Sequence, residues 1–267
     1  MFVKLTIPSA VLTALLGVAG IISKVYMLPV FFVISYIGFF LLWVLSCFVC
    51  TRFINMKKEY SGNSLLFRSY TNCIIDSLIK ISRIKLHISG MECLPNEKFL
   101  LAGNHKSAWD PLLTMGVLRK YNMSFVAKKE IFRIPIIRRL MHRCLCLSLD
   151  RDNIRQQVKT INRASEIIQS QEASIGIYPE GTRNRSKELM PFMNGAFKVA
   201  KKAECPIVVA VIRNPELISK NAPFKRTDVY LNFIGILDKD FVLQHTTVQI
   251  GDAVLNMMND KMKKISV

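Results

Sequence analysis

The sequence places a histidine and an aspartate five residues apart in a short polar stretch that follows an apolar run. His105 and Asp110 lie in the segment GNHKSAWDP, which ends at Pro111. Because Pro111 disfavours an α conformation at Asp110 and suits the first position of a helix, we expect the pair to bracket a loop between strand and helix. Such a loop lets the carboxylate orient the imidazole, which then takes a proton as a general base. The alternative is that Asp110 only caps the helix and that His105 is a polar loop residue.

A second polar stretch, YPEGTR, begins at Tyr178 after another apolar run. A proline followed two residues later by a glycine predicts a tight turn. This turn would expose Thr182 and Arg183, whose hydroxyl and guanidinium groups suit a phosphate. Taken alone, the stretch is also consistent with a surface turn that carries a solvated arginine.

Basic residues follow a third apolar run. Lys128, Lys129 and Arg133 lie in the segment KKEIFRIP, which ends at Pro135. These cations are candidates to bind phosphate, and Lys128 is the one that we retain. A solvated run of charges is the alternative interpretation.

Apolar periodicity predicts strands that alternate with helices after the N-terminal part of the chain. This pattern is typical of an α/β domain, here with a mostly parallel mixed sheet flanked by helices. Each of the three polar stretches follows a predicted strand, and ligands of open α/β sheets bind outside the carboxyl ends of strands. The predicted strands lie near residues 84–88, 99–102, 124–127, 145–149, 174–178, 207–212 and 229–234, and the predicted helices near residues 63–82, 112–120, 153–171, 192–202 and 247–264.

The N-terminal part of the chain is apolar. Residues 5–22 and residues 26–50 carry no charge, and each run approaches or exceeds the length that crosses a hydrocarbon core of roughly 30 Å as a helix. We therefore expect residues 1–52 to form a hydrophobic hairpin that spans the bilayer or dips into one leaflet, and residues 53–267 to form the catalytic domain. A cleavable signal peptide is the alternative for the first run, but a second apolar run follows at once.

Basic residues flank the end of the second apolar run, at Arg52, Lys57 and Lys58. Because positive charge next to a membrane segment favours the cytoplasmic side, this bias predicts a membrane protein with its catalytic domain on the cytoplasmic face.

The 267-residue chain has a formal net charge of +18. The first 50 residues hold two basic side chains and no acidic one, so the remaining 217 residues carry 35 basic and 19 acidic side chains. Such an excess suits nucleic acid or an anionic surface such as phospholipid headgroups. The apolar N-terminal part and the absence of a basic, aromatic-rich nucleic-acid motif favour a phospholipid membrane as partner, and no nucleic acid.

Metal and redox chemistry have little support in the sequence. The seven cysteines include one C-x-x-C, Cys47 and Cys50, which lies inside an apolar run without a second pair. The histidines are scattered without ligand spacing, so we expect no metal site. No G-x-S-x-G nucleophile motif occurs, which weakens a hydrolase interpretation. The four histidines are His87, His105, His142 and His245.

Together, the three polar stretches resemble the motif set of the glycerolipid acyltransferases related to bacterial 1-acylglycerol-3-phosphate acyltransferase (lysophosphatidic acid acyltransferase). The resemblance covers residues 86–212 in order. NHKSAWD is similar to the family's NHxxxxD block, KKEIFRIP to its K-x-E block and YPEGTR to its (F/Y)PEGTR block, with Ser186 near the usual serine. Asp150 and Arg151 resemble the DR pair between the second and third blocks, and residues 207–211 the apolar fourth block.

The resemblance implies transfer of a fatty acyl group from acyl-CoA or acyl-carrier protein to the sn-2 hydroxyl of 1-acylglycerol 3-phosphate, which gives phosphatidic acid in phospholipid biosynthesis. It implies that His105 and Asp110 are catalytic. No covalent acyl-enzyme is needed because the thioester is already activated, and no cofactor is expected besides this co-substrate. The residues implied to bind substrate are Asn104, Lys128, Glu180, Gly181, Thr182 and Arg183.

Two departures from the family pattern bear on specificity for the acyl chain or the acceptor, and not on the proton chemistry. Pro206 lies at the start of the fourth block instead of inside it. The second block has isoleucine at Ile131 and lacks the usual glycine after Pro135, where residues 136–138 read IIR. Alternative functions are an acyltransferase of the same fold that acts on glycerol 3-phosphate or another lysophospholipid, and a transacylase without a CoA requirement. A non-catalytic, basic protein that binds membrane surfaces is the alternative from another class.

Overall fold

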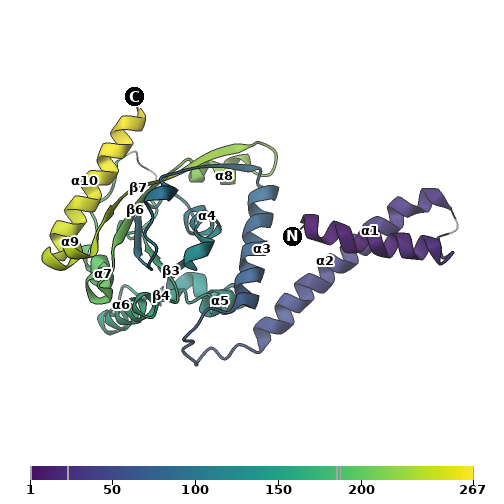
Figure 1. Ribbon diagram of the computed structural model, residues 1–267, viewed down its shortest axis with the longest axis horizontal. Helices are drawn as coiled ribbons and strands as arrows, with labels where there is room; N and C mark the ends of the chain where they lie inside the picture. Colours follow the sequence, from purple (N-terminus) through teal and green to yellow (C-terminus); the bar gives the residue numbers. More distant parts are fainter. Residues whose placement is uncertain (1, 23, 185, 187, 267) are drawn as a thin grey trace. The chain divides into compact units, whose positions relative to one another are not determined.

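The computed structural model describes residues 2–22, 24–184, 186 and 188–266 (Figure 1). The chain forms two compact units, Met1–Lys57 and Lys58–Val267. The division therefore falls after Lys57, whereas the sequence analysis placed it after residue 52.

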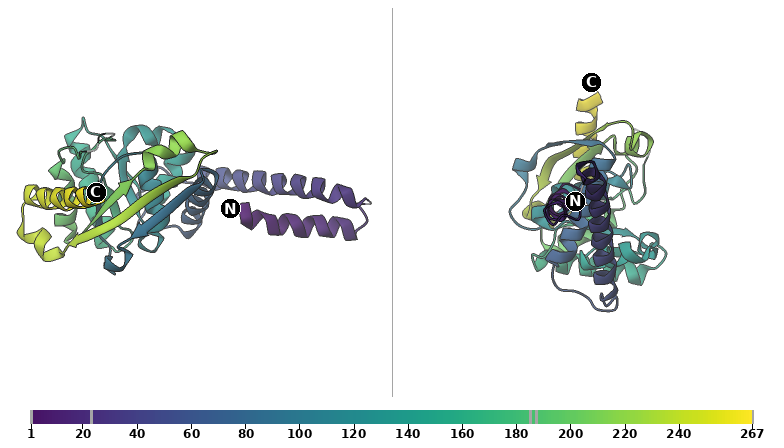
Figure 2. Two further views of the ribbon diagram at one scale, coloured as in Figure 1. Left: turned by 90° about the horizontal axis from the view of Figure 1, so that it is seen from above. Right: turned by 90° about the vertical axis from the view of Figure 1, so that its right-hand side faces the viewer.

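The first unit is a pair of helices joined by a short 3-10 helix (Figure 2). Partly buried hydroxyls join the pair: Thr13 Oγ1 and Ser35 Oγ lie 3.4 Å apart, and Ser35 Oγ lies 3.4 Å from the carbonyl oxygen of Ser9. Small hydroxylated residues allow helices to approach closely in apolar surroundings. By length and composition, Val25–Arg52 is able to cross a bilayer. The elements are α1 (Phe2–Val18), η1 (Val25–Met27) and α2 (Leu28–Arg52).

The second unit is built on a seven-stranded sheet in the order β1-β7-β6-β2-β5-β3-β4. Neighbouring strands are parallel except β6 and β7, which are antiparallel. The expected mixed, mostly parallel sheet is thus confirmed, with a strand near each of the seven predicted positions. The strands are β1 (Ile84–Ser89), β2 (Leu100–Gly103), β3 (Ser124–Lys128), β4 (Leu147–Leu149), β5 (Ile175–Ile177), β6 (Ile207–Arg213) and β7 (Thr227–Leu237).

Helices cover both faces of this sheet, and their bounds correct the sequence analysis at several places. The helix expected at residues 192–202 is a 3-10 helix followed by a short α-helix, and three helices (α5, α8 and α9) were not predicted. The helices are α3 (Leu65–Ile81), α4 (Trp109–Val117), α5 (Pro135–Arg143), α6 (Ile154–Gln169), α7 (Lys198–Ala203), α8 (Pro215–Asn221), α9 (Lys239–Gln244) and α10 (Thr247–Ser266), with 3-10 helices η2 (Met91–Cys93), η3 (Arg119–Tyr121), η4 (Lys129–Arg133) and η5 (Asn194–Phe197).

Two hydrophobic cores flank the sheet because alternate residues of its strands point to opposite faces. In β6, Val209 and Val211 pack with α6, α7 and α10, whereas Val208 and Ala210 pack with α4 and α8. Figure 1 shows these two groups of helices on opposite sides of the sheet. A strand buried on both faces reads as a continuous apolar run, which explains why β6 was recognisable in the sequence.

A buried arginine fixes α3 to the sheet. Arg68 is 8% exposed. Its guanidinium donates to the carbonyl oxygens of Met123 (2.5 Å) and Cys144 (2.9 Å) and to Ser124 Oγ (2.8 Å). A buried cation is costly unless its donors are satisfied, and carbonyl dipoles satisfy them here. The arginine therefore sets where α3 lies against β3.

Candidate active site

The three polar stretches follow strands that are neighbours in the sheet. Strands β2, β5 and β3 lie side by side and parallel, so their carboxyl ends share one edge. His105 follows the end of β2 by two residues, Glu180 follows the end of β5 by three, and Lys128 is the last residue of β3. The fold therefore brings these stretches to the edge where open α/β sheets bind their ligands.

Asp110 holds the imidazole of His105 in one orientation. His105 Nδ1 lies 2.8 Å from Asp110 Oδ2, and the same oxygen accepts the backbone N–H groups of Lys106 (2.7 Å) and Ser107 (2.8 Å). Because the carboxylate keeps the proton on Nδ1, Nε2 is the nitrogen that accepts a further proton. The His105 side chain is 18% exposed and that of Asp110 is fully buried, so only the histidine reaches the surface.

The helix that carries Asp110 begins earlier than the sequence predicts. Helix α4 starts at Trp109, so Asp110 lies in its first turn and Pro111 is its third residue. Proline is tolerated there because the N–H groups of the first turn have no acceptor within the helix. The N-cap position belongs to Ala108, so Asp110 is not the N-cap residue that the alternative interpretation required.

Burial raises the pKa of the Asp110 carboxyl above its ordinary value, and hydrogen bonds from His105, Ser107 and Lys106 offset part of this increase. Within the described part of the chain, Asp110 Oδ1 has no hydrogen-bond partner. The carboxylate is therefore held by donors on one oxygen and destabilised by desolvation. Such an arrangement is typical of groups retained for function.

Glu180 joins the loop after β2 to the loop after β5. It is 2% exposed, and its Oε1 accepts the backbone N–H of His105 at 2.9 Å. Its Oε2 accepts the side-chain N–H of Asn184 (2.6 Å) and the backbone N–H of Met190 (3.0 Å). The sequence analysis placed Glu180 among the substrate-binding residues. In the structure, both carboxylate oxygens are occupied by the protein, so Glu180 positions the backbone of His105.

Asn104, also expected to bind substrate, has a similar position. It is 1% exposed. Its side-chain N–H donates to the carbonyl oxygen of Ile212 (3.0 Å), and its side-chain oxygen accepts the Ile212 N–H (2.8 Å). The amide therefore pairs with the backbone near the end of β6 and ties the His105 loop to that strand.

The YPEGTR stretch forms the tight turn that its proline and glycine predict. The Gly181 N–H donates to the carbonyl oxygen of Tyr178 at 2.9 Å. Gly181 has φ +70°, a left-handed backbone conformation that favours glycine. Thr182 is half-buried and Arg183 is exposed. Among the described residues neither side chain has a hydrogen-bond partner, so both are free to meet a ligand.

Two adjacent lysines lie at the end of β3, and the described residues provide an acidic partner for Lys129 but not for Lys128. Lys129 Nζ lies 3.0 Å from both carboxylate oxygens of Asp150, which raises the lysine pKa and lowers the aspartate pKa. Lys128 is exposed, and no acidic group in the described part of the chain pairs with it. Arg151, next to Asp150, places its Nη2 3.4 Å from the Cβ position of Gly181. The DR pair signalled this arginine in the sequence, although it was not among the expected binding residues.

Two further residues shape the site and were not predicted to do so. The Tyr178 ring is stacked on the imidazole of His105, with centroids 4.4 Å apart, and on Phe125, with centroids 5.6 Å apart. Burial and then the Asp110 carboxylate raise the tyrosine pKa well above its ordinary value, so the phenol is neutral. Asn184 donates its backbone N–H to the His105 carbonyl oxygen at 2.7 Å. The aromatic residue that opens YPEGTR and the asparagine that follows it were the available signals.

Residues 85–213, which include every expected site residue, match the family model described as Acyltransferase. These residues form an acyltransferase domain.

Curated relatives of this acyltransferase domain extend over most of the chain. The 1-acyl-sn-glycerol-3-phosphate acyltransferase of Saccharomyces cerevisiae is 23% identical over 244 residues, which cover 90% of this chain and 78% of that protein. A protein of Mycoplasma pneumoniae, described as a probable 1-acyl-sn-glycerol-3-phosphate acyltransferase, is 29% identical over 196 residues, which cover 72% and 69%.

A solved structure supports the fold of the acyltransferase domain and of the chain as a whole. The crystal structure of the 1-acyl-sn-glycerophosphate (LPA) acyltransferase PlsC from Thermotoga maritima matches with a TM-score of 0.61 at 16% sequence identity. The match covers 100% of this chain and 98% of that chain. At this identity the likeness concerns the fold alone.

The second unit contains another His–Asp pair of almost the same length. His87 Nε2 lies 2.7 Å from Asp228 Oδ1, but the two side chains are 36% and 38% exposed. Arg226 also pairs with this carboxylate at 2.8 Å, and the hydrogen bonds from Arg226 and then His87 lower the aspartate pKa to about 2. The pair links β1 and β7, outside the edge shared by β2, β5 and β3. The His87–Asp228 pair therefore serves as a surface control in mutational tests of the His105–Asp110 pair.

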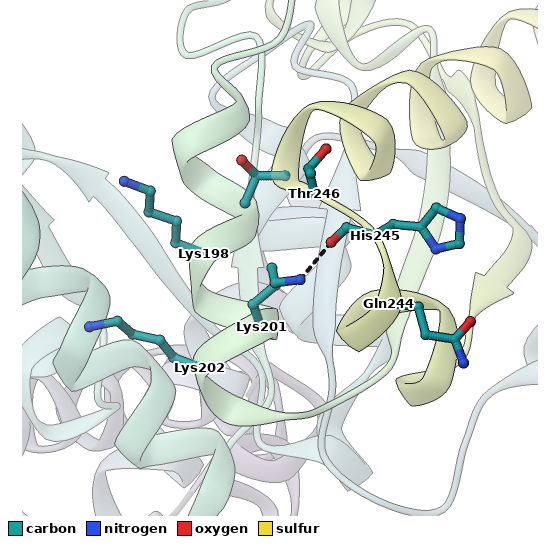
Figure 3. Close-up of a pocket in the computed structure, with 7 residues that line it drawn as sticks. Lys198, Lys201, Lys202, Gln244, His245 and Thr246 are labelled. Carbon is teal, nitrogen blue, oxygen red and sulfur yellow. Dashed lines mark hydrogen bonds between the residues drawn. The ribbon is translucent and has the colours of Figure 1, made fainter.

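A cavity of about 430 Å³ lies elsewhere in this unit, between α7 and the connection from α9 to α10 (Figure 3). Its lining includes Lys201, whose ammonium donates to the carbonyl oxygen of His245 at 2.5 Å and to those of Val242 and Leu243. The lysine thus satisfies carbonyl groups at the end of α9. Within residues 2–22, 24–184, 186 and 188–266, His, Cys, Asp and Glu side chains do not gather in groups that could hold a metal ion.

Proposed function

We propose that this chain is a membrane-bound 1-acylglycerol-3-phosphate O-acyltransferase that moves a fatty acyl group from a thioester to the sn-2 hydroxyl of 1-acylglycerol 3-phosphate and forms phosphatidic acid. The observation that carries the proposal is the His105–Asp110 pair, oriented and partly exposed inside an acyltransferase domain. The names of the yeast and Mycoplasma relatives support the choice of acceptor.

In the proposed reaction, His105 is the general base. Nε2 takes the proton of the acceptor hydroxyl as the hydroxyl oxygen attacks the thioester carbonyl carbon. Asp110 keeps Nδ1 protonated and stabilises the imidazolium that forms. The C–S bond breaks when the tetrahedral intermediate collapses, and the imidazolium returns its proton to the leaving thiolate. No covalent acyl-enzyme and no cofactor take part, because the thioester is already activated.

The phosphate of the acceptor is proposed to lie against the groups that the protein leaves unpaired at this edge. Arg183, Thr182 and Lys128 have no partner among the described residues, and Arg151 lies beside Gly181. Guanidinium and ammonium groups bind phosphate by charge-assisted hydrogen bonds. Glu180, Gly181 and Asn104 support binding indirectly, since they fix the two loops that present these groups.

Acyl-CoA and acyl-carrier protein both offer a phosphopantetheine thioester, and a basic surface suits either donor.

The second unit is proposed to lie on the cytoplasmic face of the membrane, since Arg52, Lys57 and Lys58 are at or just after the end of the apolar helix α2. Protease accessibility in oriented membrane vesicles tests this orientation: digestion of the second unit in inside-out vesicles alone supports it, and digestion in right-side-out vesicles contradicts it.

The experiment that tests the function is acyl transfer by the purified full chain in detergent, with 1-acylglycerol 3-phosphate and a long-chain acyl-CoA. Product formation is compared for the wild type, His105→Ala and the control His87→Ala. General-base catalysis contributes about 10²–10⁴-fold, so His105→Ala should lose at least a hundredfold in turnover, whereas His87→Ala should stay near the wild type.

A robust rate in His105→Ala would remove the base assignment. If the wild type gives no product, the comparison is repeated with acyl-carrier protein as donor, and with glycerol 3-phosphate or other lysophospholipids as acceptors. Product there would replace the proposed donor or acceptor. No product under any of these conditions would contradict the enzyme proposal in favour of a protein that only binds membrane surfaces.

A further inference from the structure

The segment that follows β3 exposes apolar side chains that have no part in the candidate site described above. Ile131 in η4 is 40% exposed, Ile134 between η4 and α5 is 52% exposed, and Ile136 and Ile137 in the first turn of α5 are 42% and 41% exposed. One turn later in α5, Leu140 is only 7% exposed and joins the interior. The C-terminal part of the helix is thus packed, and its N-terminal part is not. We call these four isoleucines the isoleucine patch.

Basic residues alternate with the isoleucine patch along the chain. Residues 128–143 contain six basic side chains and one acidic side chain, Glu130. Lys129 is paired with Asp150, and the Arg143 guanidinium lies 4.0 Å from the ring centroid of Tyr60. The remaining basic residues have no acidic partner among the described residues. They are Lys128, Arg133, Arg138 and Arg139.

The patch lies at the edge of the sheet that carries the candidate site. Strand β3 ends at Lys128, where η4 begins directly. Helix α5, which contacts α3, then leads to the start of β4, and β4 is parallel to β3. The start of α5 is therefore at the carboxyl edge, the edge of the His105 and Glu180 loops, and its end is at the opposite edge. An acceptor lipid that leaves a bilayer for His105 needs such a surface beside the site.

We propose that η4 and the first turn of α5 dock the catalytic unit on an anionic lipid bilayer, with the isoleucine patch among the acyl chains and Arg133 and Arg138 against headgroup phosphates. The occupant follows from the side-chain chemistry: aliphatic groups next to unpaired cations match an interface that is apolar inside and negatively charged outside. This inference rests on the proposed function only in that the acceptor is a bilayer lipid. It assigns the surface through which the enzyme meets that lipid.

The test introduces a tryptophan into the patch of the full chain. Ile137→Trp is reconstituted into vesicles of equal parts phosphatidylcholine and phosphatidylglycerol, with and without bromine in the acyl chains. The fluorescence of the parent chain, from Trp43 and Trp109, is subtracted. The matched control is Val248→Trp, because Val248 is 54% exposed near the start of α10. Helices α9 and α10 follow the end of β7. That end lies at the opposite edge of the sheet, since the last residue of β7 pairs with the first residue of β6.

Bromolipid should quench the indole of Ile137→Trp strongly and that of Val248→Trp little. Quenching should weaken when phosphatidylcholine replaces phosphatidylglycerol. Equal quenching in the two variants would overturn the proposal. An indole that is shielded from water but not quenched would also overturn it, since a protein surface would then cover the patch. The measurement needs no substrate, so its result is independent of whether the proposed reaction occurs.

A second pair of variants covers the case in which tryptophan disturbs α5. Ile137→Asp should raise the KM for a long-chain acceptor embedded in anionic vesicles about tenfold, and leave the KM for a water-soluble short-chain acceptor unchanged. Val248→Asp should change neither value. An unchanged KM for the embedded acceptor in Ile137→Asp would contradict the docking surface even if both variants remain active.

Discussion

The imidazole of His105 lies flat on the phenol ring of Tyr178, with 4.4 Å between the ring centroids and 12° between the ring planes. The phenol hydroxyl is buried and has no hydrogen-bond partner in the described part of the chain. Tyr178 also lines a cavity of about 10 Å³, roughly the space of one water molecule. The ring thus supports the imidazole of His105, the proposed general base, from one face, while Asp110 holds it from its edge.

The tyrosine ring and its hydroxyl should contribute differently. Tyr178→Phe keeps the stack and removes a buried polar group, so we expect turnover within about twofold of the wild type and a free energy of unfolding equal to it or up to about 1 kcal/mol higher. Tyr178→Ala removes a partly buried aromatic ring that stacks on His105 and Phe125, and should lower the free energy of unfolding by up to about 3 kcal/mol. Thermal unfolding in detergent and acyl-transfer rates measure both. A large loss of rate in Tyr178→Phe would show that the hydroxyl has a role of its own.

Asp110→Asn should change the dependence of stability on pH. Because the native pKa is raised, the folded state holds the Asp110 proton more tightly than the unfolded state does. The resulting stabilisation is complete below the ordinary value of 3.8 and is lost as pH rises through the raised native value. Asparagine does not titrate, so the melting temperature of Asp110→Asn relative to the wild type should increase across that window, although turnover is lost. A constant difference at all pH values would contradict the raised pKa.

Glu180→Gln should loosen the loop that carries His105. The carboxylate accepts three N–H groups. Glutamine replaces one of the two acceptor oxygens with an NH2 group, which would point at N–H donors of the protein. We expect a loss of about 1–3 kcal/mol in stability, a lower kcat and faster hydrogen exchange at the His105 amide. Glu188→Gln is the matched control, since the Glu188 side chain is exposed in the same loop. Similar exchange rates in the two variants would argue against Glu180 as a positioning residue.

Arg183→Ala should raise the KM of the phosphorylated acceptor with little change in kcat. Loss of a charge-assisted hydrogen bond to phosphate costs about 1.5–3 kcal/mol, which corresponds to about 10–160-fold in KM. Arg119→Ala is the control, because Arg119 is 41% exposed, pairs with Asp76 and follows α4. Initial rates over a range of acceptor concentrations separate KM from kcat. An unchanged KM in Arg183→Ala would exclude a contact with the acceptor.

Much of the fold was readable in the sequence because it depends on local patterns. Apolar runs such as residues 207–212 predict buried strands, and the alternation of strands with helices predicts the α/β class. Helix α5 was missed for a local reason as well. Its sequence PIIRRLMHR follows a charge run that suited a solvated segment, and its Pro135 was taken for the end of a motif instead of the start of a helix.

The sequence by itself determined the chemistry that is available: a histidine and an aspartate after one strand, a glycine turn after a second and a lysine at the end of a third. The tertiary structure decided which of these groups bond to the protein itself and which stay available to a ligand. Glu180 and Asn104 carry side chains that suit substrate binding, yet their polar atoms bond to the backbone of His105 and Ile212. Only the strand order brings those partners within reach, because a buried polar group bonds to whatever the fold places beside it.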